Sequence, residues 1–254
     1  MAAGKVIFVS AGPGAADLIT LRGARALAAA DVVLFDALTD PTLRELAPQA
    51  RWLDVGKRGF TNSTAQTAIN ALLVKQALSH AVVVRLKGGD ASIFGRLEEE
   101  LLALGQAGIA CEVVPGVTAA LAAAAHTQRP LTRRGQGRSV SLTTAMTQEG
   151  ALRALRSADT EVFYMAGRQL AALSRKLVEA GWPVDTPCSV VSRAGCADAL
   201  ASEHPVSGLA AAALLHNGRP TVVTVGAGAR VVVKTVPKAP ELERQQSRAK
   251  TLSD

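Results

Sequence analysis

The residues best suited to chemistry lie directly after a run of β-branched residues. Residues 82–86 (VVVRL) predict a buried strand, which the sequence KGGD at residues 87–90 ends in a tight turn. Gly88 and Gly89 allow a ligand to approach the main chain closely, and Asp90 places an acceptor at the carboxyl end of the strand. Ligands of open α/β sheets bind at that end, so this turn is a candidate binding site. The alternative is an ordinary strand-to-helix connection with a solvated aspartate.

Two further sets of charged residues follow predicted strands. Asp36 ends the apolar run at residues 31–36 (DVVLFD), and Lys57 and Arg58 form a glycine-flanked turn after the short strand at residues 51–55. Because ligands of α/β sheets bind at the carboxyl ends of strands, these side chains are further candidates for a binding site. Asp36 as a turn residue or helix cap, and the two cations as solvated charges, are equally open interpretations.

Metal and disulfide chemistry have little support in the sequence. The three cysteines are odd in number and widely spaced, so they predict neither a disulfide framework nor a paired metal site. The four histidines are scattered without the spacing of metal ligands. We therefore expect no metal.

The elements that position these residues alternate between strand and helix. The chain begins with a strand at residues 5–10, a glycine loop (AGPGAAD) and a helix at residues 17–30, for which Asp17 is the expected N-cap. A dinucleotide-binding fingerprint would have glycine where Asp17 stands, and Pro13 lacks an amide donor. A Rossmann-type NAD(P) oxidoreductase is therefore a weakened alternative.

The same alternation predicts an α/β protein of two domains. Residues 1–115 form an N-terminal domain with a mostly parallel sheet, because strands joined through helices run parallel. Residues 116–236 form a C-terminal domain whose sheet is mixed, because the closing sequence predicts a hairpin about residues 226–228. Residues 237–254 lack apolar periodicity and predict a mobile tail.

Composition narrows the class of protein. The chain has 254 residues, of which 48% are hydrophobic and 19% charged, so it can bury substantial cores. Its net charge of +7 fits an anionic small ligand, whereas an aromatic content of 3% argues against nucleic acid as a partner. No apolar run is long enough for a membrane span and no signal peptide is present, so we expect a cytoplasmic protein without a membrane partner.

Several short motifs, in one order over nearly the whole chain, carry a family resemblance. They include VSAGPGAADLITL at residues 9–21, VGKR at residues 55–58, VRLKGGD at residues 84–90, FGR at residues 94–96, VPGVTA at residues 114–119 and the pair Tyr164-Met165. In these motifs the chain resembles the tetrapyrrole methylases, and within that family the branch that methylates uroporphyrinogen III.

The resemblance implies a fold and an activity. Members have two α/β domains with the active site in the cleft between them, and they are typically homodimers. The implied reaction transfers two methyl groups from S-adenosyl-L-methionine to carbon atoms of uroporphyrinogen III. It gives precorrin-2 for sirohaem, cobalamin or haem d1 biosynthesis, and S-adenosyl-L-homocysteine as the second product.

The resemblance also implies roles for individual residues. Asp36 matches the proton acceptor of the family and Lys57 its proton donor. The cofactor contacts would be Pro13, Gly88, Gly89, Asp90, Ile93, Thr118, Ala119, Met165 and Gly195. The tetrapyrrole would be held by Arg96, Glu99, Arg134 and Met165.

Departures from the family pattern fall near the expected pocket. They are Ala15, Ala91, Ser92, Leu97, Arg133 and Ala166, where members usually have other residues. These changes keep two further alternatives open. One is a methylase of a later corrin precursor, and the other is a non-catalytic paralogue that binds a tetrapyrrole or adenosyl ligand.

Overall fold

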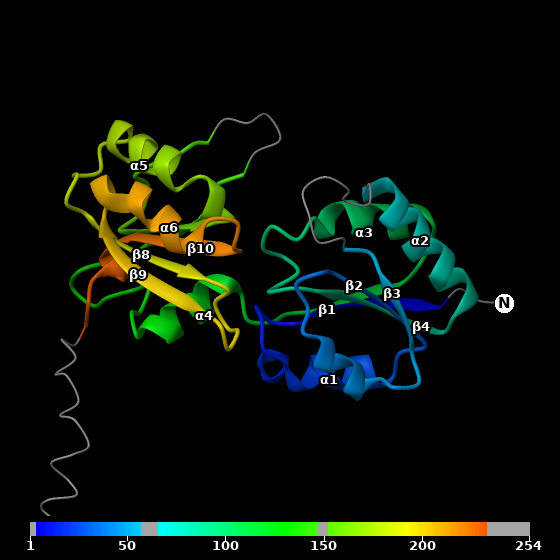
Figure 1. Cartoon of the computed structure of the whole chain (residues 1–254). Helices are drawn as coiled ribbons and strands as arrows, with labels where there is room; N and C mark the ends of the chain where they lie inside the picture. The colour runs from blue at the N-terminus through cyan, green and yellow to red at the C-terminus, as the bar shows by residue number, and fades with distance from the viewer. Residues whose placement is uncertain (1–3, 57–65, 147–151, 233–254) are drawn as a thin grey trace, which may run out of the picture.

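The computed structural model describes residues 4–56, 66–146 and 152–232, which form two lobes with one five-stranded sheet each (Figure 1). The N-terminal sheet contains β1 (Lys5–Ser10), β2 (Val32–Phe35), β3 (Arg51–Asp54), β4 (Val82–Lys87) and β5 (Cys111–Val114). The C-terminal sheet contains β6 (Val140–Thr144), β7 (Thr160–Tyr164), β8 (Pro187–Ser192), β9 (Leu200–Pro205) and β10 (Thr221–Gly226).

All pairings in the N-terminal sheet are parallel, and its strand order is β3-β2-β4-β1-β5. The prediction of a parallel sheet is confirmed. Because β4 lies between β2 and β1, the order differs from that of the Rossmann fold, in which the first strand lies next to the second.

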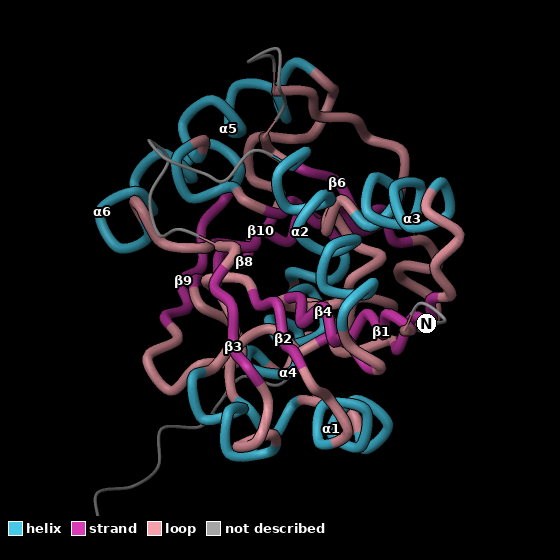
Figure 2. The backbone as a smooth tube through the Cα atoms, turned by 90° about the vertical axis from the view of Figure 1, so that its right-hand side faces the viewer, coloured by secondary structure: helices cyan, strands magenta, loops and turns pink. Residues whose placement is uncertain are grey.

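Helices cover both faces of this sheet. Figures 1 and 2 show α1 (Leu21–Ala28) on one side, and α2 (Gln66–Ser79) and α3 (Leu97–Gln106) on the other. The chain leaves β1 toward β2 and leaves β4 toward β5, so these two connections run in opposite directions. The carboxyl ends of β1 and β4 therefore form the switch point at which ligands of α/β sheets bind.

The helix after the glycine loop begins later than the sequence predicts. Ala16–Leu18 form a single 3-10 turn, Ile19 is extended, and the Thr20 side chain accepts a hydrogen bond from the Gly23 amide at 3.1 Å. Thr20 is thus the N-cap, and the prediction that Asp17 fills this role was wrong. The extended backbone at Ile19 and Thr20 separates Asp17 from the helix.

The C-terminal sheet is mixed, as predicted, but for a different reason. Its order is β6-β7-β10-β8-β9, and β10 lies antiparallel between β7 and β8, which come from earlier in the chain. After β10 the chain enters a 3-10 turn, η5 (Ala227–Ala229), and residues 230–232 form no strand. The predicted hairpin was therefore wrong over these residues, and the rest of its second strand lies outside the described residues.

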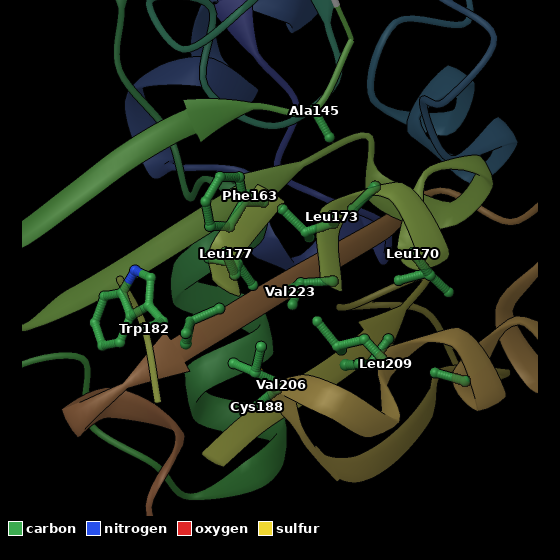
Figure 3. Close-up of a cluster of buried hydrophobic side chains, with 14 of the residues drawn as sticks. Ala145, Phe163, Leu170, Leu173, Leu177, Trp182, Cys188, Val206, Leu209 and Val223 are labelled. Atoms are coloured by element: carbon green, nitrogen blue, oxygen red, sulfur yellow. The ribbon is translucent and has the colours of Figure 1, made fainter. Parts of the chain in front are cut away.

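An apolar cluster fixes α5 (Leu170–Glu179) to the C-terminal sheet. Figure 3 shows Leu170, Leu173 and Leu177 directed at Phe163 and Val223 of the sheet. The five side chains are at most 1% exposed. Burying each large apolar side chain contributes about 1.5–3 kcal/mol, so this face is a strong source of stability for the lobe.

Residues 115–118 connect the two lobes. Val114 ends the first sheet, and α4 (Ala119–Thr127), which follows, packs against β7 and β10 of the second. Within the described residues, no helix combines the length and the apolar character that crossing a membrane requires.

Candidate active site

The loops after β1 and β4 are joined at the switch point. The Ala11 amide donates to the Lys87 carbonyl at 2.8 Å, and Gly12 and Gly89 exchange backbone hydrogen bonds of 3.2 and 2.7 Å. Gly89 has a φ of +69°, which favours glycine, and a Cβ atom built there would meet no atom within 4 Å. The main chain at Gly89 is therefore open to a ligand.

Asp90 connects two loops instead of pointing unpaired into the site. Its Oδ1 accepts from the Ser92 amide and its Oδ2 from the Gly116 amide, both at 2.8 Å. The carboxylate thus holds the loop after β4 against the loop after β5. Asp90 therefore fixes the relative position of these two loops through its backbone partners.

The C-terminal lobe reaches the same place through the loop after β8. The Ala15 amide donates to the Gly195 carbonyl at 2.8 Å. Gly195 has a φ of +87°, and a Cβ atom there would lie 3.0 Å from Cγ of Pro13. Pro13 and Gly195, predicted cofactor contacts from different lobes, are therefore neighbours.

Tyr164 at the end of β7 completes the junction between the lobes. Its hydroxyl lies 2.8 Å from Oγ1 of Thr118, and its ring meets Phe94 edge-on at 5.0 Å between centroids. Burial raises the pKa of Tyr164, so the hydroxyl keeps its proton at neutral pH. Ile93 and Ala119 pack against the same apolar cluster as Tyr164.

Phe94 and Met165 have left-handed backbones, with φ of 53° and 56°, and each side chain is 42% exposed. Such conformations are uncommon for residues other than glycine and concentrate at functional sites. Phe94 and Tyr164 were not among the predicted site residues, although both stand in the motifs that carry the resemblance. That Tyr164 is the single tyrosine of the chain was an available but weak signal.

The predicted cofactor contacts therefore gather on five loops, which follow β1, β4, β5, β7 and β8. These loops supply open main chain at Gly89, the exposed apolar side chains of Phe94 and Met165, and a partly buried hydroxyl pair, Thr118 and Tyr164. This combination fits an adenosyl ligand, which has a flat aromatic ring system and polar substituents. Among the described residues, no group of three or more histidine, cysteine or acidic side chains is placed to hold a metal ion.

Asp36 lies at the carboxyl end of β2, beside the switch point. Its Oδ1 pairs with Nη2 of Arg85 at 2.6 Å, and its side chain is 32% exposed. A cavity of about 550 Å³, lined also by Asp40, Asp54 and Arg44, opens beside it. The carboxylate is therefore anchored yet accessible, whereas Lys57, its predicted partner, lies outside the described residues.

Arg85 belongs to a buried network of alternating charges that the sequence analysis missed. Its Nε contacts Oε1 of Glu100 at 3.0 Å, and Nζ of Lys87 contacts Oε2 of Glu100 at 2.9 Å. Burial opposes the charge on Arg85, but Asp36 and Glu100 outweigh it and raise the pKa of Arg85. Burial and then the nearby Arg85 lower the pKa of Lys87.

The available signal was strand alternation, which puts Arg85 and Lys87 on one face of β4. The acidic run at residues 98–100 predicts a solvent-facing side of a helix, and this expectation was wrong for Glu100, which is fully buried.

The predicted tetrapyrrole contacts do not all lie together. Arg96 and Glu99 form a bidentate pair at 2.7 and 2.8 Å, about half exposed, at the start of α3. Arg134 is exposed in the loop between α4 and β6. In the same loop as Arg134, the Leu131 carbonyl accepts a hydrogen bond from the hydroxyl of Thr160, at the amino end of β7. Met165, in contrast, follows the carboxyl end of β7. At about 3.3 Å per residue, the length of β7 separates Arg134 from Met165.

The chain is similar in sequence to known proteins. Residues 5–210 match the family described as Tetrapyrrole (Corrin/Porphyrin) Methylases. A Uroporphyrinogen-III C-methyltransferase of Pseudomonas aeruginosa is 46% identical over 195 residues, which are 75% of this chain and 80% of the relative. A Siroheme synthase of Baumannia cicadellinicola is 44% identical over 197 residues, 75% of this chain but only 43% of that protein.

Solved structures show the same fold. The native uroporphyrin III C-methyl transferase of Thermus thermophilus aligns with a TM-score of 0.80 at 32% identity, covering 92% of this chain and 98% of that one. A structure of the Thermus thermophilus enzyme complexed with S-adenyl homocysteine aligns at 0.77 with 34% identity, covering 88% and 97%. With its sheets, its switch-point loops and this match over most of its length, the chain belongs to the tetrapyrrole methylases.

Proposed function

We propose that this protein is an S-adenosyl-L-methionine-dependent C-methyltransferase that adds two methyl groups to uroporphyrinogen III and yields precorrin-2. The observation that carries the proposal is the meeting of loops from both lobes at the switch point. They meet in a chain 46% identical to a relative named for this activity. The strand order and the incomplete glycine fingerprint both disfavour a Rossmann oxidoreductase.

The cofactor site lies between the lobes. Gly89 offers main chain without side-chain obstruction, and Gly88 beside it lies close to the Leu38 side chain. Pro13 and Gly195 close one side, and Asp90 holds the loops after β4 and β5 together. Ile93, Thr118, Ala119 and Met165 supply the other contacts. When bound, S-adenosyl-L-methionine supplies an electrophilic methyl group, and holding the acceptor carbon in line with it can contribute about 7–11 kcal/mol.

Asp36 is the residue that stabilises positive charge on the substrate and accepts its proton. Positive charge develops on the pyrrole as its carbon is methylated, and a nearby carboxylate stabilises that charge. Asp36 then accepts the proton that the alkylated macrocycle releases, and Lys57 is the proposed proton donor. Arg96, paired with Glu99, is the proposed partner of the acetate or propionate arms of the macrocycle.

The biological setting follows from the substrate. Precorrin-2 feeds sirohaem, cobalamin or haem d1 biosynthesis. We propose a homodimer in the cytoplasm, as in similar methylases. The chain covers less than half of the siroheme synthase that it matches, so the further activities of that protein are not assigned to this chain.

An anaerobic assay tests the function directly. Purified protein is incubated with uroporphyrinogen III and S-adenosyl-L-methionine, and the products are followed by absorbance and mass spectrometry. We expect a product that carries two added methyl groups. A product only with a later corrin precursor would identify the alternative methylase. Binding of S-adenosyl-L-homocysteine without product, at enzyme excess, would identify a non-catalytic paralogue.

A further inference from the structure

We propose that Arg85 is the positioning residue of Asp36, and that Glu100 and Lys87 hold Arg85 in place for this task. The inference rests on the proposed function, because it assumes that Asp36 accepts a proton from the substrate. It concerns residues to which neither the sequence motifs nor the family resemblance gave a role.

The guanidinium of Arg85 contacts Asp36 with one nitrogen and is fixed by the others. Nη2 pairs with Asp36, Nε with Glu100, and Nη1 donates to the carbonyls of Leu34 and Leu86 at 3.4 and 3.1 Å. A planar fork held at all three nitrogens has little freedom to rotate. The position of Oδ1 of Asp36 is thus set by the interior of the sheet.

The network has three buried side chains and one accessible side chain. The side chains of Arg85 and Lys87 are 3% exposed and that of Glu100 is fully buried, whereas Asp36 is 32% exposed. Three charges are therefore withdrawn from solvent, and the fourth faces the cavity beside β2. Buried ion pairs seldom add stability over apolar packing, so a role at the accessible end explains the arrangement better.

The charges of the network balance one another. Glu100 shares the same guanidinium and Lys87 in turn neutralises Glu100, so the four charges alternate and sum to zero. Among the described residues, no hydrogen bond engages Oδ2 of Asp36, which leaves this oxygen for the substrate proton.

A double-mutant cycle separates positioning from a general structural role. Arg85→Lys keeps the charge but cannot span both carboxylates. We expect it to lower kcat about 100-fold where Asp36 is present, because small misplacements of a reacting group have effects of this size. In the Asp36→Asn background the same change should lower the single-turnover rate less than about twofold, since residues acting as a unit are non-additive.

Binding measurements and matched variants complete the experiment. The affinity for S-adenosyl-L-homocysteine, measured by calorimetry, should change less than about twofold in Arg85→Lys. Arg51 is an exposed arginine of the same sheet, so the control variant Arg51→Lys should leave kcat unchanged. If Arg85→Lys does not fold, Glu100→Gln carries the test, with an expected loss of about tenfold that also vanishes in Asp36→Asn. Glu98→Gln, exposed on the same helix, is its control.

The outcomes distinguish this inference from the proposed function. Equal losses in both Asp36 backgrounds, in an active wild type, would mean that Arg85 acts independently of Asp36 and would overturn the positioning role alone. Absence of methylated product from the wild type would overturn the proposed function, and this inference with it.

Discussion

Among the described residues each lobe buries one glutamate, and the two lobes satisfy its hydrogen bonds differently. Glu161, in β7 of the C-terminal lobe, is held by neutral donors: its Oε1 accepts from the amides of Ser157 and Ala158 and from the Ser157 hydroxyl at 2.8–3.1 Å. Glu100, in α3 of the N-terminal lobe, is held by the cations Arg85 and Lys87.

The contrast teaches what each charge is for. Glu161 fastens a loop to the start of a strand, a structural task that amide groups complete without other charges. Glu100 balances two buried cations at the carboxyl ends of the strands, where ligands bind. A fold can avoid the second arrangement by using apolar side chains, as the face beneath α5 does.

The largest effect on stability is expected from replacing each of the two buried glutamates by alanine. Glu100→Ala leaves Lys87 buried without its carboxylate and removes one of the two carboxylates paired with Arg85, so we expect the free energy of unfolding of the N-terminal lobe to fall by about 3–5 kcal/mol. Glu161→Ala leaves only neutral donors unpaired and should lower the stability of its lobe by about 1–3 kcal/mol.

The two tryptophans allow the lobes to be followed separately in urea. Trp52 reports on the N-terminal lobe and Trp182 on the C-terminal lobe, so each variant is combined with Phe in place of the other tryptophan. Equal losses of unfolding free energy in the two glutamate variants would contradict the difference between a glutamate held by cations and one held by neutral donors.

A second pair compares carboxylates that bridge backbone amides. Asp90→Ala should weaken binding of S-adenosyl-L-homocysteine about 10- to 100-fold, because two hydrogen bonds to a charged group hold the pocket loops together. Asp159 bridges the Arg138 and Ser139 amides at the amino end of β7, so Asp159→Ala should leave the affinity unchanged. Calorimetry measures both, and unchanged affinity in Asp90→Ala would exclude the KGGD turn as cofactor site.

A third pair compares two arginines assigned to the tetrapyrrole. Arg96→Ala should raise the KM for uroporphyrinogen III about tenfold, the loss expected for one charge-assisted contact of about 1.4 kcal/mol. Arg134→Ala should change it less than about twofold, because that loop lies at the other end of β7. A larger effect at Arg134 would show that substrate reaches a surface that one chain does not bring near Met165.

The smallest effect concerns pH. Burial, with the charges of His204 and Arg219, lowers the pKa of His216, whose ring nitrogens contact the hydroxyls of Ser192 and Ser202. The unfolded chain therefore binds a proton that the folded chain resists, and stability should fall as pH drops below about 6.5. The free energy of unfolding in urea, followed by Trp182 fluorescence, should depend less on pH in His216→Gln than in the exposed control His126→Gln.

Most of the fold followed from periodicity. The strand predicted at residues 5–10 matches β1 without change, because a short β-branched run that ends in a glycine loop has few other interpretations. β9, in contrast, was missed: its sequence LASEHP is polar and ends in proline. It is an edge strand of its sheet, where solvent exposure tolerates such residues.

The sequence predicted the parts of the site that lie in short motifs, but not the contacts between residues far apart in the chain. The sequence placed Asp36 and the KGGD turn at the carboxyl ends of strands, which the structure bears out. It could not show that Asp90 binds Gly116, or that Phe94 meets Tyr164, because those partners are 26 and 70 residues apart in the chain.

The sequence by itself determined the local elements, the glycine turns and the family of this protein, because each of these is written in short runs of residues. Only the tertiary structure decided which charges face each other. Strand order places Arg85 of β4 beside Asp36, which follows β2, and helix packing brings Glu100 underneath them. Electrostatic interactions depend on distance through space, and the separation of residues along the chain does not reveal it.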